Sequence, residues 1–492
     1  MPKRIFHILI FILFIILLAV IQFGTPDLPD NDGFYHIKLA WLMRTESLKP
    51  NFYWLPTTIL NAREFYDHHF LYHVALIPFT LGDLLIGAKW SAVIFAAIAF
   101  LAVWYLFRTQ QVPVSWLWAL GLFAVSTPFL YRMSVVRAQS LSVGVLALGL
   151  AFLLRGKLKS LAVLSFLYVW MYDAFPLIFA LAVLHSTSIL LLEKRLELRP
   201  LLWTGGGILA GLIINPYFPN NIIFTYHHLL PKLLDATSTS VGNEWYPYNT
   251  DQILENSLFA LVAFVGGILA LGLSGRKMET RTATALLAVL LFGAMFFKAR
   301  RFIEYFAPFA LVFSAFAWEP LLQNGIEKAL HGGWVSRLKT HLPHIGLAAL
   351  IFIGAAISVP AAREQVANSK PYHLYAGASE WLIMNTEPGE RIFHTDWDDF
   401  PRLFFYNTHN TYLVGLDPTY MQLYDADLYD EWVAITRGEV DQPSESIARR
   451  FSARFVHTDL HHKKFISQAE KDPHLVEVYR DDQAIIYEVL QP

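Results

Sequence analysis

Long apolar runs, separated by short polar segments, fill the first three quarters of the chain. The first run, residues 5–23, follows Lys3 and Arg4, is longer than a signal-peptide core and has no small-residue cleavage site after it, so it predicts a retained membrane span. Together the runs predict about eleven membrane-spanning helices. The further runs lie at 88–107, 115–130, 139–154, 159–171, 175–193, 200–214, 256–274, 282–297, 303–318 and 344–360. Residues 66–86 are expected to lie along the membrane interface or dip into it.

Basic residues between the apolar runs indicate the orientation. Cytoplasmic loops carry an excess of Lys and Arg, and such clusters occur here in alternate loops. The N-terminus is therefore predicted to be cytoplasmic, which puts the loops 24–87 and 215–255 and everything after residue 361 outside, in a cell membrane. The clusters are Lys3 and Arg4; Arg155, Lys157 and Lys159; Lys194, Arg195 and Arg199; Arg276, Lys277 and Arg281; and Lys328, Arg337 and Lys339.

The pattern changes after about residue 375. A helical stretch (AGASEWLIMN) is followed by short apolar strands at Arg391–His394, Arg454–His457 and Ala484–Val489, with helices between them. The predicted fold class is thus a polytopic α-helical membrane protein, with a transmembrane domain at 1–360 and a small extracytoplasmic α/β domain at 361–492.

Composition agrees with a membrane protein and excludes some functions. The 492 residues are 55% hydrophobic and only 16% charged, too apolar for an average soluble protein of several domains. A net charge of -2 gives no general attraction to nucleic acid. The absence of cysteine excludes disulfides, thiolate metal sites and a cysteine nucleophile.

Two polar clusters in the outer loop 24–87 are candidates for catalysis or metal binding. Asp32 and His36 are four residues apart and share one face of a predicted helix, where they could bind a metal or take a proton. The segment 66–73 carries Asp67 and three histidines (His68, His69 and His73) directly against an apolar run, and their oxygen and imidazole donors suit a divalent cation. Helix capping by Asp32 and the tolerance of His and Tyr for the headgroup layer explain the same residues without a metal.

Arginines break the charge rule on the predicted outer side. Arg132 and Arg137 fall in one short outer loop, and Lys298, Arg300 and Arg301 fall in another. A guanidinium group makes charge-assisted hydrogen bonds of about 1.5–3 kcal/mol each to phosphate, so a lipid phosphate or diphosphate is the expected partner. Snorkelling to lipid headgroups is the alternative.

Other polar residues lie at span ends or strand ends. Ionisable or amide groups near membrane depth are functional candidates by default, although Asp173 and Asn215 could equally end or cap helices. In the tail, the acidic and aromatic cluster of Trp397, Asp398 and Asp399 follows a predicted strand, a position that suits ligand binding in an α/β fold. The span-end residues are Gln139, Asp173, Asn215 and Glu244.

In order along the chain, these motifs resemble those of the GT-C superfamily of membrane glycosyltransferases, particularly oligosaccharyltransferase catalytic subunits and their bacterial relatives. Residues 32–38 resemble the first outer-loop Asp motif, and 66–72 the His-rich or Pro-rich segment before the second span. Residues 136–142 (VRAQSLS) resemble an Arg-x-Gln-Leu-Ser entry to a later span. Glu244 with Trp245 is similar to an outer-loop Glu segment, 300–306 to the arginine segment that holds the lipid phosphate, and 396–400 weakly to a Trp-Trp-Asp acceptor motif.

The resemblance implies an inverting glycosyltransferase that uses a polyprenyl-phosphate or diphosphate donor and an unknown acceptor (protein, lipid or polysaccharide). It implies catalytic roles for Asp32, His36, Asp67 and Glu244, and an optional Mg²⁺ or Mn²⁺ at Asp32, Asp67, His68 and His69. The family's metal-binding Asp and Glu are absent near Arg137 and Gln139, which puts the cation in doubt. The implied substrate-binding residues are Arg132, Arg137, Gln139, Asp173, Arg300, Arg301, Tyr305, Trp397, Asp398 and Asp399.

Two rival hypotheses remain open at this point. A transporter or lipid-glycan binding protein would also use arginines on a headgroup, but would need its acids near the bilayer midplane rather than at the outer boundary. A degenerate relative kept as an assembly scaffold would lack the acidic motif, as this chain does.

Overall fold

The computed structural model describes residues 3–229, 242–330 and 334–490. They divide into two compact units, each assembled from separate stretches of the chain. The helical unit comprises Met1–Pro26, Lys89–Ile214 and Gly242–Ser369, and the mixed unit comprises Asp27–Ala88, Asn215–Val241 and Lys370–Pro492. The sequence-based division placed residues 27–88 with the transmembrane domain, whereas the mixed unit combines them with the tail.

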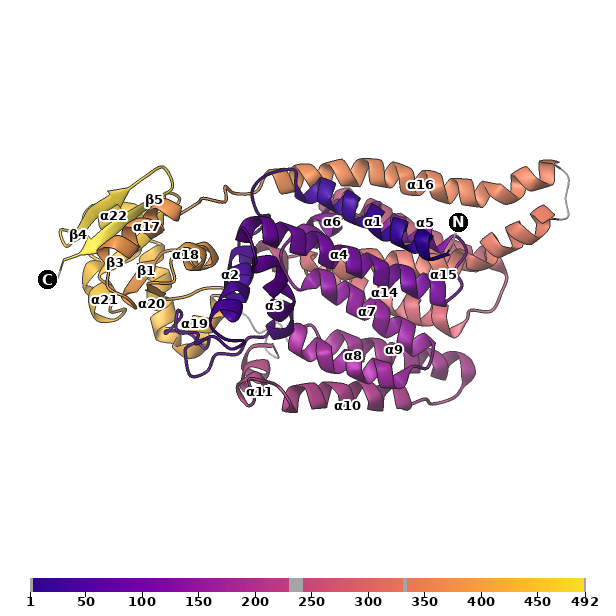
Figure 1. Ribbon diagram of the computed structural model, residues 1–492, viewed down its shortest axis with the longest axis horizontal. Coiled ribbons are helices and arrows are strands. Elements are labelled where there is room, and N and C mark those ends of the chain that lie inside the picture. Colours follow the sequence, from indigo (N-terminus) through magenta and orange to yellow (C-terminus); the bar gives the residue numbers. More distant parts are fainter. Residues whose placement is uncertain (1–2, 230–241, 331–333, 491–492) are drawn as a thin grey trace. The chain divides into compact units, whose positions relative to one another are not determined.

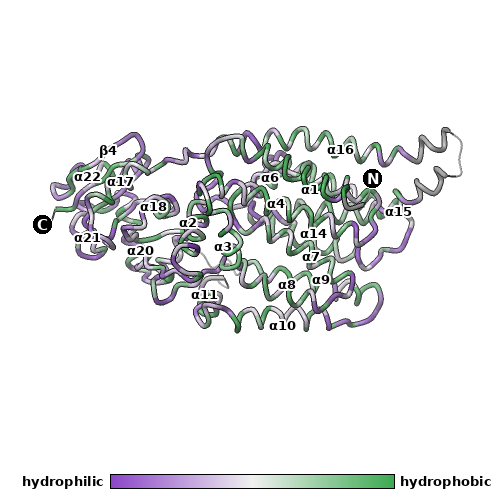
Figure 2. The backbone as a smooth tube through the Cα atoms, in the orientation of Figure 1, coloured by the Kyte–Doolittle hydropathy of each residue, from purple (hydrophilic) through white to green (hydrophobic). Residues whose placement is uncertain are grey.

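Most predicted spans are helices, and most of the helical unit is hydrophobic along its length (Figures 1 and 2). Among the described residues, seven helices are long and apolar enough to cross a membrane, or eight if a bent pair counts as one span. The chain is therefore a multi-pass membrane protein, while the count of about eleven stays a prediction. The helices are α1 (Lys3–Gln22), α4 (Leu84–Thr109), α7 (Gln139–Leu154), α8 (Leu158–Met171), α9 (Pro176–Glu193), α10 (Arg199–Ile213), α13 (Thr250–Ser274), α14 (Thr280–Lys298), α15 (Ile303–Leu330) and α16 (Trp334–Ala367).

The apolar run 115–130 is not one helix. It divides into α5 (Ser115–Leu120), the 3-10 turn η2 (Gly121–Phe123) and α6 (Thr127–Ser134). Ser126 has extended backbone angles, and its hydroxyl accepts the N–H of Phe129 as the N-cap of α6. A new helix therefore begins at Thr127, and α6 then meets α7 at a bend of 109°.

Close helix packing in this unit depends on glycine. In α10, Gly207 lies against the backbone of Ala162 in α8, and Gly211 lies against Phe166 and Val169. Small residues let helix backbones approach each other in a membrane, where van der Waals packing supplies much of the association energy. Helices α8 and α10 accordingly run side by side (Figure 1).

The tail forms a five-stranded mixed sheet in the order β2-β1-β3-β5-β4. Strands β1 (Arg391–His394), β2 (Thr411–Tyr412) and β3 (Phe455–Asp459) are parallel, and β5 (Ala484–Val489) runs antiparallel to β3 and to β4 (Leu475–Arg480). The predicted helix 376–385 and the three predicted strands are confirmed, β3 beginning one residue later than expected. The helices are α17 (Ala376–Asn385), α18 (Phe400–Tyr406), α19 (Thr419–Tyr424), α20 (Ala426–Thr436), α21 (Ser444–Arg449) and α22 (Lys463–Ala469).

The segment 27–88 packs against this tail inside the mixed unit. It contains α2 (Asp32–Thr45), α3 (Phe70–Leu76) and the 3-10 turn η1 (Ile77–Thr80). The N–H of Tyr412 donates to the carbonyl of Trp54 at 2.8 Å, and the guanidinium of Arg402, only 1% exposed, donates to the Asn31 side chain at 2.7 Å. The unit also includes α11 (Asn220–Phe224) and the π-helical turn η3 (Thr225–Leu229).

Candidate functional site

Breaks between helices bring three arginines of the helical unit together. Arg132 lies in the last turn of α6, and Arg137 lies in the bend that follows it. Arg301 belongs to the 3-10 turn η5 (Arg300–Phe302), which forms because Ala299 leaves α14 in an extended conformation. Each guanidinium group thus comes from a helix end, where the backbone turns.

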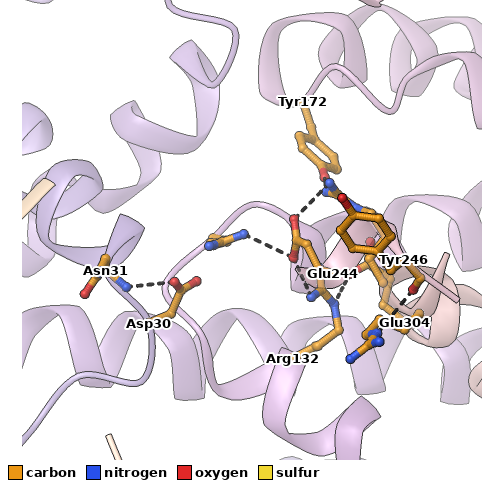
Figure 3. A network of polar contacts seen from close by, with 10 residues as sticks. Asp30, Asn31, Arg132, Tyr172, Glu244, Tyr246 and Glu304 are labelled. Atoms are coloured by element: carbon orange, nitrogen blue, oxygen red, sulfur yellow. Dashed lines mark hydrogen bonds and ion pairs between the residues drawn. The ribbon is translucent and has the colours of Figure 1, made fainter. Parts of the chain in front are cut away.

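A carboxylate from a fourth segment lies at the centre of these arginines. Glu244 belongs to the turn η4 (Asn243–Trp245), which follows Gly242 at a φ of 95° and precedes the capping box of Asn249 that begins α13. Its carboxylate lies 2.9 Å from Nη1 of Arg132, 3.0 Å from Nη1 of Arg301 and 3.6 Å from Nη1 of Arg137. Figure 3 shows the guanidinium groups directed at this carboxylate. We call these four residues the arginine hub.

Glu304 of α15 and Tyr172, which directly follows α8, contact the hub arginines. Nε of Arg132 donates to Glu304 at 2.6 Å, and Glu304 is 1% exposed. Nη2 of Arg301 donates to the hydroxyl of Tyr172 at 3.3 Å (Figure 3). Arg132 and Arg301 therefore each have at least two fixed contacts, which limits the rotation of their guanidinium groups.

Aromatic rings cover both arginines of η5. Trp245 lies 4.3 Å from the Arg301 guanidinium, and Tyr248 lies 4.8 Å from that of Arg300, within the range of cation–π attraction. Arg300 donates to the carbonyls of Tyr246 and Pro247. The structure thus places Arg300 outside the hub, where it secures the segment that carries Glu244.

Positively charged groups surround the hub carboxylate. Three guanidinium groups lie near Glu244, and Arg132 also contacts the carboxylate of Glu304. Nη2 of Arg132 is buried without a hydrogen-bond partner among the residues described. Burial raises the pKa of Glu244, but the charges of Arg301, Arg132 and Arg137 outweigh burial and hold that pKa below its usual range. The hub therefore suits an anion.

The other predicted substrate-binding residues of the helical unit lie close to the hub in the sequence or in the adjoining helices. Gln139 begins α7 directly after the bend and is 3% exposed, and Asp173 follows Tyr172. The hydroxyl of Tyr305 lies 2.9 Å from that of Ser142 in the buried interior. Tyr305 therefore contacts the helices beneath the hub rather than the carboxylate.

The predicted outer-loop residues lie in the mixed unit. His36 is in α2, one turn after Asp32, and its Nδ1 lies 2.7 Å from Nε2 of His73. Nδ1 of His73 in turn lies 2.9 and 2.8 Å from the two oxygens of Asp67. The structure thus joins His36 to Asp67 through His73, the third histidine of the predicted cluster at 66–73.

The predicted divalent cation stays a prediction. Among the described residues, no three His, Cys, Asp or Glu side chains are grouped as metal ligands. His68 stacks on Phe224 with 5.1 Å between ring centroids, and the backbone N–H of His69 donates to Asp67 at 3.0 Å.

The acidic cluster of the tail is buried in the mixed unit. Asp398 accepts a hydrogen bond of 2.6 Å from the Asn31 side chain, and Asp399 is 3% exposed. Burial, with the nearby charges of Asp30 and Asp396, raises the pKa of Asp398 to about 6. Trp397 packs against the core of the tail.

The sequence did not indicate Glu304 or Tyr172 as site residues. An acidic residue inside an apolar span was a usable signal for Glu304, because membrane-embedded carboxylates are rare and usually functional. Tyr172 precedes the predicted Asp173, but its position has no distinctive spacing.

Comparison with solved structures identifies the fold. The oligosaccharyltransferase AglB from Archaeoglobus fulgidus, in complex with an inhibitory peptide and a dolichol-phosphate, aligns with a TM-score of 0.66 at 14% identity, covering 96% of this chain and 71% of that one. ArnT from Cupriavidus metallidurans, bound to undecaprenyl phosphate, gives a TM-score of 0.62 at 14% identity, covering 99% and 98%. The mycobacterial arabinofuranosyltransferase AftD gives 0.60 at 13% identity, covering 100% of this chain and 40% of that one.

All three are GT-C glycosyltransferases, so the chain has the GT-C fold, as the resemblance predicted. No family model matches the sequence, and no curated protein matches it. At these identities the likeness shows the fold, and function has to be argued from the site.

Proposed function

We propose that the protein is a glycosyltransferase that takes a sugar or glycan from a polyprenyl-phosphate or diphosphate donor and passes it to an acceptor at the outer face of the membrane. The arginine hub is the observation that carries this proposal. Three guanidinium groups already surround one oxyanion, and those of Arg132 and Arg301 are held by contacts with Glu304, Tyr172 and Trp245. One buried N–H of Arg132 has no described partner. GT-C structures with bound polyprenyl or dolichol phosphate support a lipid phosphate as the anion.

The hub would act on the leaving group. As the bond between the anomeric carbon and the phosphate oxygen breaks, negative charge grows on the phosphate, and fixed cations stabilise this charge more in the transition state than in the ground state. Removing one such donor typically lowers the rate by about 10²- to 10³-fold.

The acceptor side of the proposal comes from the sequence. Asp32 would orient the acceptor nucleophile, and direct displacement would invert the anomeric carbon.

The test is release of polyprenyl phosphate from a lipid-linked sugar by the purified protein in liposomes. Arg301→Ala and Arg132→Ala should each lower the turnover by about 10²-fold or more. Arg281→Ala is the matched control, because Arg281 is also ion-paired and 18% exposed, against 13% for Arg301, but binds Glu319 elsewhere in the helical unit. Equal turnover in all three variants would refute the phosphate role.

The same assay examines the cation and the rival function. Loss of turnover in EDTA that Mg²⁺ or Mn²⁺ restores would support the predicted metal, whereas unchanged turnover would contradict it. Binding of the lipid that depends on Arg301, without turnover with any acceptor, would favour the transporter or binding-protein hypothesis.

A further inference from the structure

Gln139 carries a buried hydrogen-bond acceptor next to the arginine hub. The residue begins α7, two positions after Arg137, and is 3% exposed. Its Oε1 has no hydrogen-bond partner in residues 3–229, 242–330 and 334–490. Buried polar atoms in proteins are almost always hydrogen-bonded, because an unmet acceptor costs free energy. A ligand that donates a hydrogen at this position would supply the partner.

The face of α7 that carries Gln139 is directed at the start of α15, close to Arg301. Gln139 precedes Ser142 by three positions, and residues three apart in a helix share a face. The Ser142 hydroxyl lies 2.9 Å from that of Tyr305 in α15. Tyr305 follows Arg301 by four positions, which is about one helical turn. The Gln139 amide therefore lies between this hydroxyl contact and the guanidinium groups of the hub.

A second buried atom of the site lacks a partner, and it is a donor. Nη2 of Arg132 forms no hydrogen bond to any residue that the structure describes. An arginine N–H can only donate, and the amide oxygen of Gln139 can only accept. The two atoms together suit a ligand that has an anionic oxygen and, next to it, an O–H or N–H group. A glycosylated lipid phosphate has both, because its phosphate is joined directly to a sugar.

The arginines alone would favour the wrong lipid. When the bond between the anomeric carbon and the phosphate oxygen breaks, its electron pair stays with the phosphate, so the leaving lipid has one more negative charge than the donor. Guanidinium groups attract the more highly charged anion more strongly. At neutral pH a phosphate monoester is mostly doubly ionised and has no O–H to donate. A preference for the donor therefore needs a contact with the sugar itself.

We propose that Oε1 of Gln139 accepts a hydrogen bond from a hydroxyl or amide N–H group of the sugar next to the phosphate, an inference that rests on the proposed function. Gln139 is then a specificity-determining residue that makes the site prefer the glycosylated lipid over the lipid phosphate left after transfer. The hydrogen bond is lost when the sugar passes to the acceptor, so it does not hold the leaving lipid in the site.

Gln139→Met keeps the length of the side chain and removes its amide. Titrations in nanodiscs compare undecaprenyl phosphate with four glycolipids, which are undecaprenyl phosphates that carry glucose, galactose, xylose or N-acetylglucosamine. The wild type should bind at least one glycolipid more tightly than undecaprenyl phosphate. For that glycolipid the variant should lose about 5- to 30-fold in affinity, as for one buried hydrogen bond, and its affinity for undecaprenyl phosphate should not change.

Three results of these titrations would overturn the proposal. A wild type that binds every glycolipid more weakly than undecaprenyl phosphate has no preference to explain. An equal loss of affinity for both kinds of lipid in Gln139→Met would mean that the amide serves the phosphate. No loss for either would mean that water satisfies Oε1.

Ser140→Ala is the matched control. Ser140 is 1% exposed, and its hydroxyl also has no hydrogen-bond partner among the described residues. It precedes Gly144 by four positions, and Gly144 lies against the backbone of Ala99 in α4, so Ser140 is on a different face of α7 from Gln139. Ser140→Ala should leave both affinities unchanged. If it lowers the glycolipid affinity as much as Gln139→Met does, the effect belongs to helix packing and the proposal is wrong.

The wild type provides a second measurement that does not depend on the folding of any variant. Among analogues of the best-bound glycolipid that each lack one hydroxyl or the amide N–H, one should bind about 5- to 30-fold more weakly than the parent. If every analogue binds as tightly as the parent, the proposal is overturned. Turnover that is unchanged in Arg301→Ala would overturn the proposed function. Turnover that is lost in Arg301→Ala, with the wild-type ratio of affinities in Gln139→Met, would overturn this inference alone.

Discussion

Glu244→Gln tests whether the hub carboxylate and the donor phosphate use the same guanidinium groups. The substitution keeps the side-chain shape but removes the charge that contacts Arg132, Arg301 and Arg137 at 2.9, 3.0 and 3.6 Å. The net charge of the hub then becomes more positive by one unit. The variant should bind a phosphate monoester more tightly and unfold more easily.

The size of the effect follows from Coulomb's law. A carboxylate about 6 Å from a bound phosphate repels it by about 2.8 kcal/mol per unit charge at an effective dielectric of about 20. Glu244 is 26% exposed, so solvent and salt screen part of this repulsion. We expect about 1–2 kcal/mol, which is an increase in affinity of about 5- to 30-fold. Breaking the buried ion pairs should lower the free energy of unfolding by about 2–4 kcal/mol.

The assay is titration of undecaprenyl phosphate into nanodiscs that hold the wild type or Glu244→Gln, at two salt concentrations. The gain in affinity should shrink at high salt, because it is electrostatic. Weaker binding by Glu244→Gln would refute the reasoning, since it would mean that Glu244 organises the arginines for the anion rather than competing with it.

Three other predictions concern stability. Asp398 has a pKa of about 6 in the folded protein and about 3.9 when unfolded, so its contribution to stability is present below pH 4 and is lost as the pH rises through 6. Asp398→Asn should therefore raise the free energy of unfolding at pH 7.5 by about 1–3 kcal/mol and have no effect on it at pH 4. Chemical denaturation at the two pH values measures both. Gly207→Val should lower the free energy of unfolding by about 1–3 kcal/mol, because the added Cβ overlaps the backbone of Ala162. It should not change the affinity for lipid phosphate, because the overlap involves no hub residue. Reduced affinity in a variant that is folded as fully as the wild type would contradict this. Ser126 caps the helix that carries Arg132. Ser126→Ala should therefore lower the free energy of unfolding by about 1 kcal/mol, measured by thermal unfolding, and weaken lipid-phosphate binding severalfold. Unchanged binding would show that the cap does not position that arginine.

The membrane class and the tail were predictable because each depends on local pattern. The length of an apolar run identifies a helix that can cross a bilayer, and alternating short segments predicted β1 and β5 to the residue. The arginines stood out because Arg132 and Arg301 break a charge rule that depends only on loop composition.

Features that depend on distant contacts were not predictable in the same way. The backbone hydrogen bond between Tyr412 and Trp54 joins the segment 27–88 to the tail. No pattern in the sequence of either segment indicates it. The division of the run 115–130 was missed because apolarity alone does not reveal a break, although Pro128 near a Ser-Thr pair is a typical helix start. The hydrogen bonds that join Asp67, His73 and His36 could not be predicted, because they depend on how α3 packs against α2.

A structure with undecaprenyl phosphate bound tests the role of the arginine hub most directly. We expect the phosphate oxygens to lie within hydrogen-bond distance of Arg132 and Arg301, and the Glu244 carboxylate to have moved away from their guanidinium groups. A phosphate bound elsewhere, with Glu244 still paired to the arginines, would contradict that role.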